Sequence, residues 1–375
     1  MTKHITILAE DTSGDVYASW VIKKLRAKKI DFSCDGIAGD LARREGMTLW
    51  IHNSSMNFMG MTQVIANASK IRTVWRLILD NLNKKKPDLL ILIDYPGLNM
   101  RIAKQAKAMN IPILYFVPPQ VWAWGRKRIQ QLRTNVDQIA CLYPFEQDFF
   151  EKVKLPTFLV EHPLQITSQI MPLVRLKNSE PAHIVCLPGS RKQEIAKHLS
   201  DMLEACYILQ NTMKREIRCS VVQAPAAVSI YPIVLAWGDK LQISIIKNAD
   251  KLSALKDAEA ACVVSGTACF ELALLGIPHT VVYKTGWINY FLARWLLAKR
   301  IRWISLTNLV NQKSVVKELI QHESKPENIA KELSRLITNQ EARQSMHQDF
   351  ARMRDYLSAR AHCPVEKLII DMLKD

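Results

Sequence analysis

The sequence lacks several features that define whole classes of protein. Its 375 residues include only 12 glycines and 16 prolines, too few for a collagen-like or low-complexity chain. No uncharged apolar run reaches the roughly 18 residues that a membrane-spanning helix needs. The first residues form a short strand-like run without the apolar stretch and cleavage site of a signal peptide. We therefore expect a globular chain with neither a leader nor a membrane-spanning helix.

The cysteines also lack a pattern that would bind metal or form disulfides. None of the eight belongs to a C-x-x-C pair, and most lie in apolar runs such as the one around Cys262. This usage is typical of free thiols in a reducing cytoplasm. The cysteines therefore give no support for a zinc site or a disulfide framework.

Acidic residues are outnumbered, since 35 Asp and Glu stand against 51 Lys and Arg and give a formal net charge of +16. Composition alone leaves four interpretations open: a solvated basic surface, a nucleic acid, an anionic membrane surface and a phosphorylated substrate. No module that combines basic and aromatic residues for nucleic-acid binding is visible, so we expect no nucleic-acid partner.

Apolar runs of strand length alternate with helical patterns along most of the chain. Residues 88–94 are nearly all apolar, which is typical of a strand buried on both faces of a parallel sheet. The pattern restarts at about residue 183, after an aperiodic connector. The sequence therefore predicts an α/β protein with two Rossmann-like, doubly wound domains, at residues 1–165 and 166–340, followed by helices at 341–375.

Carboxylates follow two of the predicted strands of the first domain. The turn at residues 9–15 contains Asp11, and it lies where open α/β sheets bind ligands. Ser13 or Asp15 could cap the following helix, which is the structural alternative. Asp94 ends the most apolar strand, where a carboxylate is costly unless it has a partner or lines a cleft. We favour a general base or an orienting group at Asp94 over a buried structural aspartate.

Two turns of the second domain have the form of anion-binding sites. Gly189, Ser190 and Arg191 join a strand to a helix, where backbone N–H groups bind anions and an arginine adds a bidentate donor. Ser265, Gly266 and Thr267 repeat this geometry. Glu271 follows one turn later and could reach ribose hydroxyls, although an exposed helix glutamate is the alternative. Two such turns favour a nucleotide diphosphate.

Tryptophans occur beside basic residues in three segments. Trp122 and Trp124 precede a basic helix and fit a cleft wall or an interface. Residues 286–303 are too charged to span a bilayer but fit an amphipathic helix at a membrane surface; a core helix with snorkelling cations is the alternative. The candidate membrane residues are Trp75, Arg76, Trp287, Arg294, Trp295, Lys299 and Arg300.

Taken together, the motifs resemble those of lipid-A-disaccharide synthases over nearly the whole chain. The quoted positions are Asp11 to Asp15, Met59 and Gly60, Asp94 to Pro96, Trp122 to Trp124, Pro144 to Glu146, His162 and Pro163, Leu187 to Glu194, Ser265 to Glu271, Tyr283 and Lys284, and Ser305 to Leu309. The resemblance implies a GT-B glycosyltransferase of Gram-negative bacteria, with two domains facing a cleft and C-terminal helices that pack back on the first domain.

The resemblance also implies a reaction. Such enzymes join UDP-2,3-diacylglucosamine to 2,3-diacylglucosamine 1-phosphate (lipid X), release UDP, and need no metal or cofactor. An enzyme with these substrates is expected at the cytoplasmic face of the inner membrane, in peripheral contact with anionic lipids. A homodimer is left open.

Several site residues acquire roles by resemblance. Asp94 matches the essential aspartate of the family and is the candidate base, and Asp11 stands where the family has a glutamate. Arg191 matches the arginine that meets the diphosphate, Glu271 the ribose-binding glutamate, and Asn308 the asparagine of a Ser-Leu-Pro-Asn-Leu motif. Ser13, Trp122 and Trp124 are expected on the acceptor side. The positions that depart from the family pattern are Glu10 (a glycine there), Gln63, Gly97, Pro118, Gln120, Glu161 and Thr307.

Two alternatives remain. One is a different UDP-sugar enzyme of the same fold, such as the peptidoglycan N-acetylglucosaminyltransferase or an epimerase, although these lack the Trp122–Trp124 and Pro144–Glu146 motifs. The other is a catalytically weak paralogue that binds membranes through its basic surface. Such a protein would bind with a steep salt dependence and release no UDP.

Overall fold

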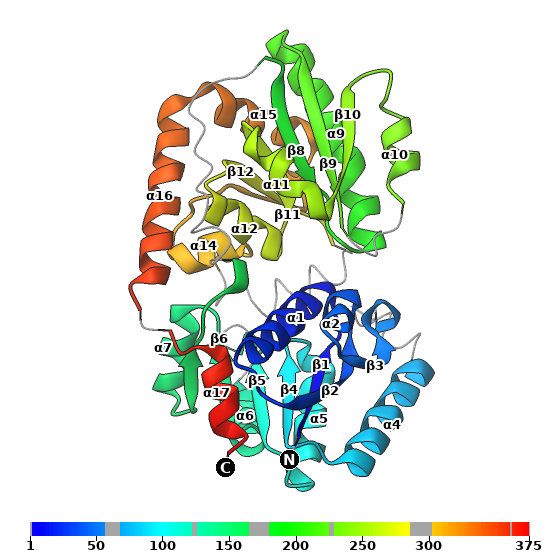
Figure 1. The fold of residues 1–375 in the computed structure, drawn as a ribbon. Coiled ribbons are helices and arrows are strands. Elements are labelled where there is room, and N and C mark those ends of the chain that lie inside the picture. Colours follow the sequence, from blue (N-terminus) through cyan, green and yellow to red (C-terminus); the bar gives the residue numbers. More distant parts are fainter. Residues whose placement is uncertain are drawn as a thin grey trace. The chain divides into compact units, whose positions relative to one another are not determined.

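The chain folds into two compact α/β units (Figure 1). The computed structural model describes residues 2–56, 68–121, 126–164, 180–224, 229–285, 302–360 and 362–374. Unit 1 comprises Met1–Pro163 and Arg360–Asp375, and unit 2 comprises Leu164–Ala359. No helix in these described ranges is both long and apolar enough to cross a membrane.

Unit 1 is built on a seven-stranded sheet with the order β3-β2-β1-β4-β5-β6-β7, in which every neighbouring pair is parallel. Strand β4 is the sequence Leu-Leu-Ile-Leu-Ile, and all five of its residues are buried because helices cover both faces of the sheet. The strands are β1 (Lys3–Ala9), β2 (Phe32–Ala38), β3 (Thr48–His52), β4 (Leu89–Ile93), β5 (Ile113–Phe116), β6 (Gln138–Cys141) and β7 (Thr157–Leu159). The helices are α1 (Thr12–Ala27), α2 (Asp40–Arg44), α4 (Ala68–Lys85), α5 (Pro96–Ala108), α6 (Arg126–Asn135), α7 (Pro144–Lys152) and α17 (Val365–Met372).

Unit 2 is built on a six-stranded parallel sheet with the order β10-β9-β8-β11-β12-β13. Both sheets thus run outward in two directions from their first strand, which is the doubly wound arrangement that the sequence predicts. The strands are β8 (Ala182–Leu187), β9 (Ile217–Gln223), β10 (Gln242–Lys247), β11 (Ala260–Val264), β12 (His279–Tyr283) and β13 (Glu318–Ile320). The helices are α9 (Lys192–Met213), α10 (Tyr231–Leu235), α11 (Lys251–Lys256), α12 (Thr267–Leu275), α14 (Leu306–Asn311), α15 (Pro326–Thr338) and α16 (Gln340–Ser358).

The C-terminal helices divide between the two units. We expected residues 341–375 to return to the first domain as one segment, but α16 packs on α12, α14 and α15 of unit 2. Its Phe350 is fully buried and stacks on His279 at 5.5 Å between ring centroids, which anchors the helix there. Helix α17 packs on α1 of unit 1, and the Cys363 N–H before it donates to the Leu159 carbonyl at 2.8 Å. The first boundary lies at Pro163–Leu164, beside the expected one at 165–166.

Asp15 of α1 caps a second helix. It is buried, and its carboxylate accepts hydrogen bonds from the backbone N–H groups of Gly39, Leu41 and Ala42 at 2.9, 3.0 and 3.0 Å. These donors lie at the start of α2, where a helix has N–H groups without intrahelical partners. The carboxylate therefore ties α1 to α2.

We expect Asp15→Ala to destabilise the protein, because three backbone N–H groups, two of them buried, lose a charged acceptor. Losing a hydrogen bond to a charged group costs about 1.5–3 kcal/mol. Urea unfolding followed by circular dichroism measures the change. Asp40→Ala is the matched control: Asp40 lies on α2 in an exposed pair with Arg43, and such pairs contribute about 1 kcal/mol or less. Equal losses in the two variants would contradict the capping role.

Candidate active site

The turns that carry the expected site residues follow the strands at which the order of each sheet reverses. In unit 1 the strand order reverses between β1 and β4, and these strands are followed by Glu10, Asp11 and Asp94. In unit 2 it reverses between β8 and β11, which are followed by Gly189–Arg191 and Ser265–Thr267. Open α/β sheets bind ligands at the carboxyl ends of strands where the order reverses. Each unit therefore brings its candidate residues to a ligand-binding position.

The turn after β4 holds Asp94 in an unusual backbone conformation. Asp94 and Tyr95 have φ angles of 49° and 44°, in the left-handed region that non-glycine residues rarely adopt. The Tyr115 hydroxyl donates to the Asp94 carbonyl at 2.7 Å. The Asn99 amide donates to the same carbonyl at 3.0 Å and to that of Ile93 at 3.3 Å. These bonds stabilise the turn and fix the direction in which the half-buried Asp94 side chain leaves the strand.

Asp11 is the N-cap of α1. One carboxylate oxygen accepts from the Gly14 N–H at 2.6 Å, and the other accepts from the Ser13 hydroxyl at 3.1 Å. The interpretation of Ser13 or Asp15 as the cap is therefore wrong. The helix begins at Thr12, so the residue before it has the extended backbone that a cap requires, and Asp15 caps α2 instead. Both carboxylate oxygens of Asp11 therefore accept hydrogen bonds from the first turn of α1.

Glu10 is a site residue that sequence reasoning did not select. It is 1% exposed and accepts a hydrogen bond from the Asn99 side chain at 3.1 Å. Burial raises its pKa well above the usual value, and the neighbouring carboxylates of Asp11 and Asp94 raise it further. The signal that could have found it was in the sequence, because a glutamate stands where the resembling family has a glycine.

His162, one of the motif residues, lies in the core of unit 1. It is fully buried, and the hydroxyls of Tyr17 and Tyr143 each approach its Nε2 at 3.4 Å. Burial lowers its pKa to about 3, so the imidazole is neutral at physiological pH. Its position is that of a packing residue rather than a proton carrier.

The backbone N–H groups of the turn after β8 are occupied by the carboxylate of Glu194. Gly189 has a φ of 102°, and a Cβ there would lie 2.6 Å from a carboxylate oxygen of Glu194. That oxygen accepts from the N–H groups of Ser190 and Arg191 at 3.2 and 3.3 Å, and the other pairs with the Arg191 guanidinium at 2.9 Å. The backbone donors that we expected to bind phosphate are thus engaged by Glu194. Arg191 is the group of this turn that remains as a phosphate-binding candidate, since its side chain is 37% exposed.

The turn after β11 leaves a helix start open. Helix α12 begins at Thr267 and has no side-chain cap on its N–H groups. Gly266 is exposed, and a Cβ added there would meet nothing within 4 Å. The Ser265 hydroxyl donates to the Ile304 carbonyl at 3.0 Å, which holds the turn. Uncapped N–H groups at the start of a helix bind anions.

Glu271 is not the exposed helix glutamate of the alternative interpretation. Its side chain is 12% exposed and accepts from Lys251 Nζ, at the start of α11, at 2.7 Å. The ion pair fixes the carboxylate one turn inside α12.

Asn308 uses its whole amide to hold a loop. It is fully buried, its Nδ2 donates to the Val316 carbonyl and to Glu318 at 2.9 Å each, and its Oδ1 accepts from the N–H groups of Val315 and Val316 at 2.8 and 2.9 Å. An amide has two hydrogens and two acceptor positions, so none is left for a ligand. The geometry gives Asn308 a supporting position, whereas we expected a nucleotide contact.

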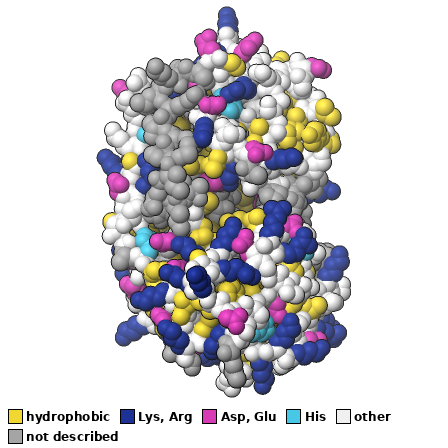
Figure 2. Space-filling view, in the orientation of Figure 1, with side chains coloured by type: hydrophobic (Ala, Val, Ile, Leu, Met, Phe, Trp, Pro, Cys, Tyr) yellow, Lys and Arg dark blue, Asp and Glu magenta, His cyan; other side chains and the backbone are white. Residues whose placement is uncertain are grey.

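Helix α4 presents a basic outer face. Trp75 is half-buried and packs against the hydrophobic core of unit 1, whereas Arg76 is exposed. The other exposed basic residues of this segment include Lys70, Arg72, Lys84 and Lys86. Figure 2 shows Lys and Arg side chains over much of the visible face of unit 1. The remaining candidate residues Trp122, Trp124, Trp287, Arg294, Trp295, Lys299 and Arg300 lie outside the described residues.

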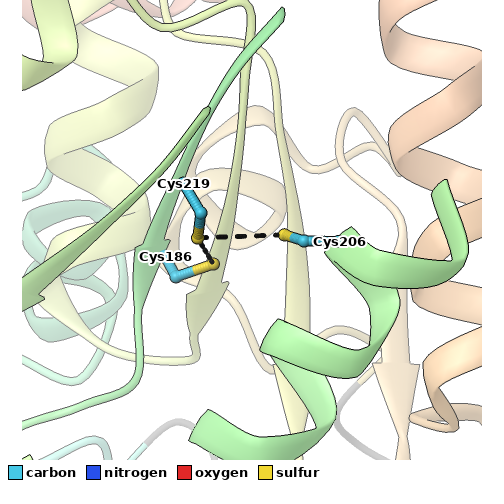
Figure 3. A group of neighbouring side chains, drawn as sticks. All are labelled: Cys186, Cys206 and Cys219. Carbon is cyan, nitrogen blue, oxygen red and sulfur yellow. Dashed lines mark hydrogen bonds between the residues drawn. The ribbon is translucent and has the colours of Figure 1, made fainter. Parts of the chain in front are cut away.

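Within the described ranges, one group of side chains could share a metal ion. Cys186 of β8, Cys206 of α9 and Cys219 of β9 are buried, and their sulfur atoms point toward one another (Figure 3). Cys219 Sγ lies 3.7 Å from that of Cys186 and 4.0 Å from that of Cys206. Contact with the other two thiols and burial raise the pKa of Cys186. Metals bind thiolates, and three thiolates in an apolar interior are costly, so the group fits packed neutral thiols better.

Comparison with known proteins shows which protein family this chain resembles. A family model described as lipid-A-disaccharide synthetase matches residues 5–371. A lipid-A-disaccharide synthase of Nitrosococcus oceani is 33% identical over 387 residues, which cover 99% of this chain and 96% of that protein. One of Coxiella burnetii is 31% identical over 358 residues, which cover 92% of this chain and 91% of that protein.

Solved structures show the same fold in more distant proteins. The UDP-GlcNAc 2-epimerase of Neisseria meningitidis, bound to UDP-GlcNAc, matches with a TM-score of 0.60 at 11% identity over 100% of both chains. The calicheamicin glycosyltransferase matches with a TM-score of 0.58 at 12% identity, over 100% of this chain and 98% of that one. At such identities the likeness shows the GT-B type of fold alone.

Proposed function

The chain belongs to the lipid-A-disaccharide synthase family, and from this premise we propose how its residues divide the work of the reaction. The enzyme is a glycosyltransferase that condenses UDP-2,3-diacylglucosamine with 2,3-diacylglucosamine 1-phosphate, giving lipid A disaccharide 1-phosphate and UDP. The observation that carries this function is the family match over nearly the whole chain. The direct test is to incubate the protein with both substrates and detect disaccharide phosphate and UDP by mass spectrometry.

Asp94 is the proposed base. An inverting transfer removes the proton of the attacking acceptor hydroxyl while its oxygen forms a bond to the anomeric carbon of the donor. The bond from that carbon to the diphosphate breaks, and UDP leaves with the electron pair. What supports Asp94 is its place after β4 at the reversal point, in a turn that Tyr115 and Asn99 hold. Asp11 serves the helix cap and adds negative charge beside it.

Unit 2 supplies the proposed UDP-sugar site. Arg191 meets the diphosphate and stabilises the charge that develops on the leaving group. The uncapped start of α12, at Ser265–Thr267, provides backbone N–H groups and the positive end of the helix dipole for the same purpose. Glu271 accepts from the ribose hydroxyls. Asn308 supports the site by holding the loop before β13, and Gly189 with Ser190 seats Glu194 beside Arg191.

The basic face of α4 is the proposed contact with the membrane. Both substrates carry acyl chains, so the enzyme meets them at the cytoplasmic face of the inner membrane, where anionic lipids attract basic side chains. The exposed cations of α4 and the net charge of +16 support this contact. Since Trp75 packs inward, the contribution of α4 is mainly electrostatic.

We expect Asp94→Asn to lower turnover by roughly 10²–10⁴-fold, the usual contribution of general-base catalysis, because the amide keeps the shape but loses the basic oxygen. The rate is measured as UDP release at saturating substrates. Asp371→Asn, an exposed aspartate of α17 in the same unit, is the control that keeps wild-type turnover. Near-normal turnover of Asp94→Asn would transfer the role of base to Asp11.

We expect Arg191→Ala to weaken UDP binding about ten- to hundredfold, because a hydrogen bond to a charged group contributes about 1.5–3 kcal/mol. Isothermal titration calorimetry with UDP measures the affinity. Arg335→Ala is the matched control, since Arg335 pairs with Glu332 three residues before it, on α15, and it should leave the affinity unchanged. Equal affinity in the two variants would remove Arg191 from the diphosphate site.

We expect the triple variant Lys70→Glu, Arg72→Glu and Arg76→Glu to lose binding to anionic vesicles at low salt, because each cation near an anionic surface contributes about 1 kcal/mol. Co-sedimentation with phosphatidylglycerol vesicles measures the binding. The control Lys317→Glu, Lys325→Glu and Lys331→Glu changes the net charge equally through exposed residues of unit 2. If both variants bind alike, net charge rather than α4 determines the association.

A further inference from the structure

Glu10 is a buried acid for which the proposed chemistry has no use. It is the first residue after β1, it is 1% exposed, and it lies at the reversal point of the unit 1 sheet. Carboxylates are rarely buried to this extent unless a partner compensates the charge. From the rest of the described residues its side chain receives a hydrogen bond from Asn99 Nδ2, at 3.1 Å to Oε2, and its own backbone N–H also interacts with the carboxyl group.

Asn99 connects Glu10 to the proposed base. Asn99 lies on α5 and is fully buried, and the nitrogen that donates to Glu10 also donates to the carbonyl oxygens of Ile93 and Asp94. The left-handed turn at Asp94 is therefore held by a side chain whose own orientation depends on Glu10. A change at Glu10 is transmitted to the backbone of Asp94 through a single amide.

The second side-chain oxygen of Glu10 and the side-chain oxygen of Asn99 indicate the charge state of Glu10. In the described residues, Glu10 Oε1 and Asn99 Oδ1 are both buried and both lack a hydrogen-bond partner. Two acceptors cannot satisfy each other, and buried acceptors without partners are costly. A carboxylic acid, unlike a carboxylate, has a hydrogen to donate to an amide oxygen. If Glu10 carries that proton, acid and amide can pair through two hydrogen bonds, and neither oxygen is left without a partner.

The surrounding charges also favour the protonated, uncharged form of Glu10. The charged groups that act on Glu10 are Asp11, next to it, and Asp94, at the end of β4; both are acidic. The Tyr115 hydroxyl on β5 donates to the Asp94 carbonyl, and the charges of Asp94, Glu10 and Arg128 on α6 all act on this hydroxyl. Burial is the main cause that raises the pKa of Glu10, and the two aspartates add to it, against smaller opposing effects of hydrogen bonds.

We propose that Glu10 is a positioning residue for Asp94 that works as an uncharged acid: paired with Asn99, it holds the turn after β4 without adding a third negative charge. The inference rests on the proposed role of Asp94 as the base. It assigns to Glu10 a role in the turnover rate and none in UDP binding, since the UDP-sugar site is proposed on unit 2.

A pH dependence follows from this assignment. As the pH rises through the raised pKa of Glu10, the proton is lost together with the hydrogen bond that it makes to Asn99 Oδ1, and a negative charge appears beside Asp94. Turnover should therefore decline on the alkaline side. The free energy of unfolding should decline over a wider pH range, because the unfolded chain loses this proton near the ordinary glutamate pKa of 4.5 while the folded chain keeps it.

The test compares Glu10→Gln with Glu10→Leu in turnover measured as UDP release across the pH range. Glutamine can donate an N–H to Asn99 Oδ1 and has no proton to lose, whereas leucine fills space without hydrogen bonds. We expect Glu10→Leu to lower kcat tenfold or more at every pH with unchanged UDP affinity. Glu10→Gln should rescue most of the neutral-pH rate, and its alkaline decline should be absent or shifted upward by at least one pH unit.

Urea unfolding of the wild type and Glu10→Gln at pH 5 and pH 8 provides a readout besides activity. The wild type should lose stability relative to the variant as the pH rises, by up to a factor of ten in the unfolding constant per pH unit. Identical alkaline limbs of turnover, or a stability difference that is independent of pH, would overturn the proposal. Failure of Asp94 as the base is distinguishable, because it appears as normal turnover of Asp94→Asn whatever Glu10→Gln does.

Discussion

A strand that is buried on both faces can present a polar side chain to a ligand only where it ends, and this constraint determines where both candidate sites lie. Strands β4 and β11 are entirely buried, so the chain can place Asp94 and the Ser265–Thr267 turn only after them. The reversal of strand order beside each of these strands separates the flanking connections and opens the sheet edge there. Packing of the apolar runs therefore decides the positions of the functional groups before their chemistry does.

Several polar side chains around each site form hydrogen bonds with neighbouring protein groups rather than facing a ligand. Asp11 caps α1, Asn308 holds the loop before β13, and Asn99 braces the turn at Asp94. Such support leaves few groups for substrates, but it fixes those few in place, and fixed groups need little reorganisation during a reaction. In unit 2 the groups that remain for the proposed UDP site are Arg191, the start of α12 and Glu271.

The sequence predicted the parts of the fold that depend on local pattern. Apolar runs revealed the strands, and the polar residues after them revealed the edges that carry Asp94 and Arg191. It could not reveal partners that lie far along the chain. The capping of α2 by Asp15 spans more than twenty residues, and the burial of Glu10 depends on α5. The helices after residue 340 have amphipathic patterns, but such patterns do not say which unit their apolar faces contact.

The carboxylate of Glu194 at the start of α9 also affects selectivity. A small anion that reaches Ser190 and Arg191 must compete with a group that is tethered there, at a high effective concentration. Inorganic phosphate, which has no other attachment point, loses this competition. In the proposed site a nucleotide has a ribose and a second phosphate to attach at Glu271 and α12, so its binding would not depend on displacing Glu194. If the proposed site is correct, the turn after β8 would favour ligands with several points of attachment over the abundant simple anions of a cell.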